Sequence, residues 1–221
     1  MTSFFTLLAR DLRLSVREGG GAALALGFFA LVAMLVPLGV GSELVVLSKV
    51  GGGVLWVGAL LAALLSLDRL FQADYEDGSL DLIVLSPLSL EAAAAAKIAG
   101  HWFSTGLPLT LLAPVLSIFF GLSGPTVLAL VVSLAIGTPA ISAVGAIGAS
   151  LTLSLRRGGL LLPLIVLPLL VPAVIFGPGL VLEAQTGMAN GALGFLAAFS
   201  LATTLLSPFV AAILVRLNLA G

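Results

Sequence analysis

Few residues in this chain could carry chemistry, and their spacing argues against a catalytic site. Ser123 lies within Gly121-Leu-Ser-Gly124, the G-x-S-G pattern of a serine nucleophile. The only imidazole that could activate it belongs to His101, and about 22 residues of mostly helical chain would separate the two by roughly 33 Å. A nucleophile and its base must lie within about 3 Å of each other. We therefore expect no protease site at Ser123.

Other common sites are absent as well. The only lysines are Lys49 and Lys97, and neither follows a glycine, so the chain has no P-loop for binding and hydrolysing ATP. There is no cysteine and only one histidine, which excludes thiolate sites and two-histidine metal sites. His101 could be an axial haem ligand, but a lone histidine near a membrane interface more often caps or packs. We expect no catalytic residue, no metal and no cofactor bound by this chain.

The composition indicates a protein whose main solvent is lipid. Apolar residues make up 60% of the 221 residues, charged residues make up 9%, and the mean hydropathy is +1.28. A soluble domain carries about 25% charged residues because its surface must face water. The net charge of −1 argues against nucleic acid, whose binding depends on clustered Lys and Arg. The composition thus predicts an all-α polytopic membrane protein.

Charged residues bound the expected membrane spans. A spanning helix needs about 20 mostly apolar residues. The long uncharged run between residues 98 and 155 is divided by the turn-forming Gly121-Leu-Ser-Gly-Pro125. We expect one transmembrane domain over residues 1–221, with six helices at about 20–40, 50–67, 92–120, 126–154, 160–181 and 192–215.

The distribution of Lys and Arg orients these helices. Lys49 is the only basic residue on one side of the expected topology. The other eight share the opposite side: Arg10, Arg13, Arg17, Arg69, Lys97, Arg156, Arg157 and Arg216. Because cytoplasmic segments carry an excess of Lys and Arg, this asymmetry predicts that both ends of the chain are cytoplasmic. No ionisable residue lies in the middle of an expected span, which disfavours a stand-alone ion-coupled transporter.

Residues 1–18 have the pattern of an amphipathic helix. Apolar side chains recur at helical spacing on one side, and Arg10, Arg13 and Arg17 lie on another, with Asp11 beside them. Such a helix would lie in the membrane interface with its basic side toward anionic headgroups. The alternative is a short helix that is solvated on all sides.

The segment 68–91 is the expected long polar connection, and it lies on the cytoplasmic side. Together with Lys97, which follows soon after, it holds eight of the nineteen charges in the chain. Asp77-Gly-Ser79 is a helix start with Asp77 or Ser79 as N-cap, and Ser86-Pro87 ends a short apolar helix. Ser89 is expected to cap the next span.

Two interpretations of this segment remain open. It could be a helical hairpin packed on its own bundle, or it could dock a cytoplasmic partner through its apolar side. A transporter body without an ATPase of its own favours docking, as in the permease of an ABC transporter. The predicted contact residues are Asp74, Tyr75, Glu76, Asp77, Gly78, Ser79, Leu80, Leu82, Leu85, Ser86 and Pro87.

The same segment carries a specific resemblance. The motif consists of Phe71-Gln-Ala-Asp-Tyr-Glu-Asp-Gly-Ser-Leu-Asp-Leu82, Leu85-Ser-Pro-Leu88, Ala96-Lys97 and His101-Trp102. It resembles the haem exporter protein B family. Members of this family are membrane subunits of the ABC transporter for cytochrome c maturation. The chain length, the six expected spans and the N-terminal helix match the family as well, so the resemblance covers essentially the whole chain.

This resemblance implies an ABC-2-like permease in the bacterial inner membrane. The implied partners are an ATP-binding subunit docked at 74–87, a second copy of the chain, a haem-handling membrane subunit and a small single-span subunit. ATP hydrolysis on the partner would drive release of a haem-loaded periplasmic chaperone, and haem would be the transported or handled ligand. The alternatives are an exporter permease for another apolar substrate and a membrane scaffold that transports nothing.

Overall fold

The computed structural model describes residues 2–17, 21–41, 43–155, 158–189 and 191–219. All regular structure in these ranges is helical, which confirms the all-α class. The elements are α1 (Thr2–Arg17), α2 (Gly21–Val40), α3 (Leu44–Leu67), α4 (Arg69–Glu76), α5 (Ser79–Leu85), α6 (Leu90–His101), a π-helix (Trp102–Gly106), α7 (Leu107–Ser117), a 3-10 helix (Ile118–Phe120), α8 (Gly124–Leu151), α9 (Gly158–Leu169), α10 (Val171–Thr186) and α11 (Ala192–Leu219).

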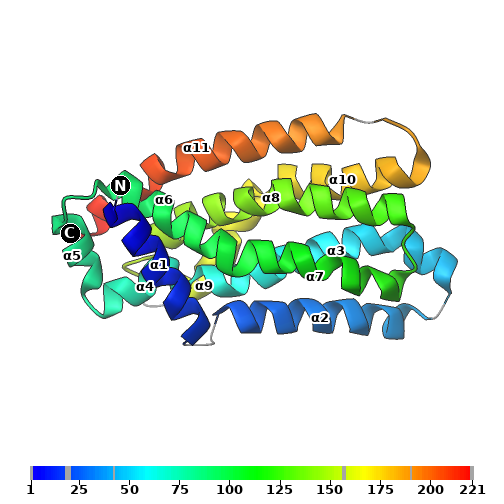
Figure 1. Ribbon diagram of the computed structural model, residues 1–221, viewed down its shortest axis with the longest axis horizontal. Helices are drawn as coiled ribbons and strands as arrows, with labels where there is room; N and C mark the ends of the chain where they lie inside the picture. The colour runs from blue at the N-terminus through cyan, green and yellow to red at the C-terminus, as the bar shows by residue number, and fades with distance from the viewer. Residues whose placement is uncertain (1, 18–20, 42, 156–157, 190, 220–221) are drawn as a thin grey trace.

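The long helices run side by side along the long axis of the molecule (Figure 1). Helices α4 and α5 lie at one end of this bundle, α1 crosses the bundle obliquely there, and the last turns of α11 reach the same end. We call it the charged end, because Arg10, Asp11, Asp74 and Lys97 meet there. A connection between α10 and α11 and the turn before α8 lie at the opposite end (Figure 1).

Five described helical segments are long and apolar enough to cross a membrane, and a bent pair makes a sixth. The five are Gly21–Val40, Leu44–Glu76, Leu90–Phe120, Gly124–Leu151 and Ala192–Leu219. The chain is therefore a multi-pass membrane protein.

The sixth candidate span consists of Leu161–Leu169 and Val171–Thr186, which meet at an angle of 57°. Pro172 explains the break, because it has no N–H to donate and its ring clashes with the carbonyl of Pro168, four residues earlier. Leu170 between the two helices has φ −90° and ψ 1°, which lies outside the α-helical region.

The structure extends the second span at both ends relative to the predicted 50–67. It begins at Leu44, so Lys49 lies within the helix, and it continues through α4 to Glu76. A single lysine does not end a helix, because its long stem lets the ammonium reach the interface. Nor does any Gly or Pro interrupt residues 68–76, so the first part of the expected polar connection is helical.

Trp56 of α3 is a packing centre of the bundle. Its side chain is fully buried, and its Nε1 donates to Ser133 Oγ on α8 at 2.9 Å. Gly137 of α8 and Gly177 of α10 face the indole so closely that a Cβ would lie 2.5 Å and 2.1 Å from it. Glycine at these two positions therefore allows α3, α8 and α10 to pack around one large aromatic ring.

Candidate functional site

Four charged side chains from three helices form an ion-pair cluster at the charged end. Arg10 Nη2 of α1 donates to Asp74 Oδ1 of α4 at 2.6 Å and to the neighbouring Asp11 at 2.9 Å. Lys97 Nζ of α6 donates to Asp11 Oδ2 at 3.1 Å and is paired directly with Asp74 Oδ2. Two cations thus meet two carboxylates, and the cluster is neutral overall.

Lys97 and Asp74 are buried in this cluster, with side chains 5% and 7% exposed. The ammonium of Lys97 also donates to the carbonyl of Leu70 at 3.1 Å and lies 5.8 Å from the ring centre of Phe71. Its three N–H groups therefore have three oxygen partners. A buried charge of this kind is tolerated only when it is paired and hydrogen-bonded.

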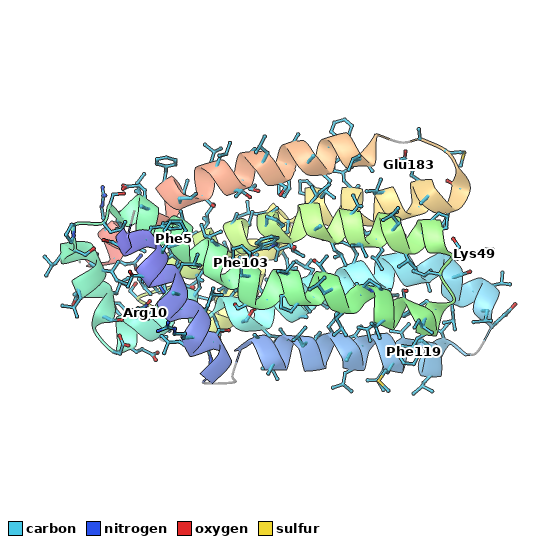
Figure 2. The ribbon with its side chains drawn as sticks, viewed as in Figure 1. Phe5, Arg10, Lys49, Phe103, Phe119 and Glu183 are labelled. Carbon is cyan, nitrogen blue, oxygen red and sulfur yellow. The ribbon has the colours of Figure 1, made fainter. Side chains whose placement is uncertain are left out.

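Arg10 stays charged in this setting. Partial burial lowers the pKa of its guanidinium, but the carboxylates of Asp11 and Asp74 outweigh this effect and raise the pKa above its ordinary value. Figure 2 shows Arg10 on α1 at the charged end, whereas Lys49 and Glu183 lie at the opposite end.

The cluster also holds the start of α5. Ser79 Oγ donates to Asp74 Oδ1 at 2.6 Å, and Ser79 N–H donates to Asp77 Oδ1 at 2.8 Å. The hydrogen bonds from Ser79 hold the pKa of Asp77 below its usual range. A single carboxylate, that of Asp74, therefore bonds α1, the start of α5 and α6.

The cap of α5 differs from the prediction. Gly78 occupies the N-cap position with φ +76°, and the carboxylate of Asp77 accepts from the N–H of Ser79, two residues further along the chain. The left-handed turn favours glycine there, which explains why neither predicted residue is the cap. The predicted cap of α6 is confirmed, because Ser89 accepts from Ala92 N–H at 3.2 Å.

We expect Gly78→Ala to lower the free energy of unfolding by about 1 kcal/mol, because a Cβ is strained at positive φ. Gly53→Ala is the matched control, since a Cβ at this helical glycine meets nothing within 4 Å. Chemical denaturation of the two purified variants in detergent measures the difference. A Gly78→Ala protein as stable as Gly53→Ala would contradict the strained turn.

The structure separates the predicted docking residues into three groups by their exposure. Asp74 and Leu80 are buried inside the chain, so the structure gives them internal partners in place of a contact surface. Ser79 and Ser86 are half-buried. Exposed at the charged end are Tyr75, Glu76, Asp77, Gly78, Leu82, Leu85 and Pro87. Whether these residues bind a partner stays a prediction.

The interfacial residues of α1 are divided in a similar way. Arg10 and Asp11 face the ion-pair cluster and are partly buried, whereas Arg13 is exposed. Arg17 lies in the last turn of α1, and its side chain is outside the described part of the structure. The expected contact of α1 with lipid headgroups remains a prediction.

His101 joins three spans through hydrogen bonds. Its Nε2 lies 2.9 Å from Ser66 Oγ on α3, and its Nδ1 lies 2.9 Å from Ser142 Oγ on α8. Both ring nitrogens thus have hydroxyl partners, and whether His101 ligates haem stays a prediction. Ser66 and His101 have the spacing of a nucleophile and base, but a hydroxyl replaces the carboxylate that stabilises the imidazolium in a catalytic triad.

The ion pairs were not predicted, because their members are far apart in sequence. Arg10 and Asp74 are separated by 64 positions, and Asp11 and Lys97 by 86. One signal pointed to them: Lys97 lies in an otherwise uncharged stretch, Ala92–Gly100, and a charge among apolar residues needs a partner.

Comparisons with known proteins agree with this architecture. A family model described as CcmB protein matches residues 2–218. Heme exporter protein B of Paracoccus denitrificans is 56% identical over 214 residues, which cover 96% of this chain and 98% of the relative. The protein of the same name from Rhodobacter capsulatus is 51% identical over 96% of this chain and 98% of the relative. The Escherichia coli protein is 38% identical over 98% and 99%. The resemblance inferred from residues 71–102 is therefore confirmed, and the chain belongs to the CcmB family.

Proposed function

We propose that this chain is the permease subunit of a haem-linked ABC transporter that acts in cytochrome c maturation. Identity of 38–56% along nearly the whole length of proteins named heme exporter protein B is the observation that carries the proposal. A bundle of apolar helices with five candidate spans and a bent sixth supports it, because a permease must cross the membrane several times.

ATP is hydrolysed by a separate subunit, since the chain has no P-loop. That subunit docks on α5. Leu82 and Leu85 are 69% and 82% exposed on this helix, and they supply the apolar side that a partner's groove can cover. The acidic Glu76 and Asp77 lie just before it.

The ion-pair cluster transmits the movement of the docked subunit. Asp74 accepts from Ser79 at the start of α5 and is paired with Arg10 of α1 and Lys97 of α6. Displacement of α5 therefore acts on α1 and on the third span through one buried carboxylate.

The remaining assignments follow the family resemblance and the charge distribution. The charged end, which includes Arg10, Arg69, Lys97 and Arg216, faces the cytoplasm of a bacterial inner membrane, and Lys49 faces the other side. A second copy of the chain, a haem-handling membrane subunit and a small single-span subunit complete the complex. Haem is the transported or handled ligand, and we assign no residue of this chain to it.

A double variant tests the docking surface. Leu82→Asp with Leu85→Asp is expected to reduce co-purification of the ATP-binding subunit at least about tenfold, because charges replace apolar contacts. The control is Met188→Asp, whose side chain is 69% exposed beyond the end of α10. If the double variant accumulates to the wild-type level and still co-purifies the ATP-binding subunit undiminished, α5 is not part of the interface.

The phenotypes of two mutant strains test the function itself. Haem staining of c-type cytochromes is measured in a strain that lacks this gene and in one whose ATP-binding subunit cannot hydrolyse ATP. Loss of c-type cytochromes in both strains is expected. Normal staining in the first would favour an exporter of another substrate, and normal staining in the second would leave a scaffold role.

A further inference from the structure

A cavity of about 170 Å³ lies beneath α1. Its outer part is lined by the ion-pair cluster and by Leu14 and Ser15 of α1. Its inner part reaches Ser66 of α3 and His101 of α6. The first residues of α2, Gly21 and Ala22, also belong to the lining.

The lining suits water. A cavity needs about 10–15 Å³ to hold one water molecule, so this cavity has room for several. The charges of Arg10, Lys97, Asp11 and Asp74 are paired with each other, and the guanidinium of Arg69 adds a further polar group to the lining. Empty cavities in proteins are apolar, whereas polar cavities of sufficient size are hydrated.

The inner wall includes a π-helical turn. Ser104 and Thr105 line the cavity and belong to the π-helix, in which Leu107 N–H donates to the Trp102 carbonyl five residues earlier. Such turns occur mostly as single insertions in α-helices, frequently at functional sites. Here the wider turn brings two hydroxyl-bearing residues to the cavity wall.

We infer that this cavity is a water-filled vestibule, open at the charged end, and that His101 exchanges its ring proton with the water inside it. His101 is a cavity-lining residue, and so is its partner Ser66. The vestibule therefore brings water to an ionisable side chain within the third span, independently of what the protein transports.

The hydrogen bonds of His101 can accommodate proton exchange. Ser66 Oγ lies 3.0 Å from the Ala63 carbonyl, and Ser142 Oγ lies 3.2 Å from the Thr138 carbonyl. With a neutral ring, one nitrogen donates to a serine and the other accepts a serine hydrogen. When that second nitrogen takes a proton from a hydronium ion in the vestibule, which is left as water, its serine turns to the backbone carbonyl, and both nitrogens donate. Return of either ring proton to a water molecule completes the exchange. Neither state leaves a buried donor without an acceptor.

The charged groups that line the vestibule with His101 come from three helices. Arg10 and Asp11 belong to α1, Arg69 and Asp74 to α4, and Lys97 to α6. From α3, the π-helix and α8, the groups that lie within hydrogen-bond distance of the ring or of Ser66 are hydroxyls and a backbone carbonyl.

Cysteine labelling tests whether the vestibule is hydrated. The chain has no cysteine, so Ser104→Cys provides the only thiol in an otherwise unchanged protein. In sealed vesicles, a membrane-impermeant thiol reagent should label it from the same side as Leu85→Cys, which marks the charged end. Met188→Cys marks the opposite end, and Ser207→Cys, which is fully buried, sets the unreactive level.

The expected rate for Ser104→Cys is at least about tenfold above that of Ser207→Cys, because thiol reactivity requires access. Thr105→Cys repeats the measurement at a second lining position. Labelling at the Ser207→Cys level, or only from the side that labels Met188→Cys, would overturn the vestibule.

Isotope exchange tests the histidine. His101 is the only histidine, so ¹⁵N-histidine in a protein purified without a histidine tag gives one assigned ring in NMR spectra. Transfer to D₂O should replace its ring hydrogen, and Ala22→Trp, which fills the vestibule, should slow this exchange at least about tenfold. Ala23→Trp is the matched control, because Ala23 is exposed and does not line the cavity. Equal exchange in the two variants would refute access through the vestibule.

Discussion

Asp74→Ala is expected to lower the free energy of unfolding by about 3–5 kcal/mol, the usual cost of removing one partner from a buried ion pair. The reason is Lys97, whose 5% exposed side chain would keep its charge but lose one of its two carboxylate partners, so the cluster would no longer be neutral. Arg10 would lose its hydrogen bond to Asp74, and Ser79 would lose the acceptor of its hydroxyl. Chemical denaturation in detergent and the amount of protein in membranes both measure this loss.

Glu76→Ala is the control for Asp74→Ala. Glu76 lies two residues further along the same helix, is exposed, and accepts from the Gln72 side chain at 2.8 Å. Its substitution should change stability by less than about 0.5 kcal/mol. Combining Asp74→Ala with Lys97→Met should restore part of the loss, because apolar residues can replace a buried pair at little cost. Equal stability of the Asp74→Ala and Glu76→Ala proteins would show that the cluster does not hold the charged end together.

Gly177→Ala is expected to cost at least about 3 kcal/mol, at the top of the range for overpacking. The added Cβ would lie 2.1 Å from Cε2 of Trp56. The indole cannot move away, because it is fully buried and also packs closely against Gly137 of α8. The variant should therefore accumulate poorly and unfold at a lower denaturant concentration than the wild type.

Gly194→Ala of α11 serves as its control, since a Cβ there meets nothing within 4 Å. Alanine is also the better helix former, so this variant should be at least as stable as the wild type. A second-site change, Trp56→Phe, removes the part of the indole that the new methyl would strike and should partly rescue Gly177→Ala. Wild-type stability of Gly177→Ala alone would mean that the three helices around Trp56 can separate without cost.

The sequence by itself determined the class of protein and the number of apolar segments. Both depend on composition and on runs of residues along the chain, because a lipid environment requires long apolar helices. The helix cap at Ser89 could also be predicted from the sequence, because Ser89 accepts from Ala92 N–H, only three residues away. The family could also be inferred, since its motif consists of short segments that follow one another between residues 71 and 102.

Segment boundaries were less well predicted, because a charge was assumed to end a helix. Lys49 lies within α3, and segment 68–76, which carries several charges, continues the second span as α4. The backbone of a helix is broken by the geometry of Gly and Pro, as at Pro172, and a flexible charged side chain at the end of a span leaves it intact.

Only the tertiary structure decided what the charged residues do. Asp74 had the sequence context of a surface contact, yet the fold brings Arg10 and Lys97 to it and buries it. His101 likewise acquires partners from α3 and α8 only when the spans assemble. These contacts join residues 23 to 64 positions apart. A local pattern can show that a charge needs a partner, but the packing of whole helices selects which partner it meets.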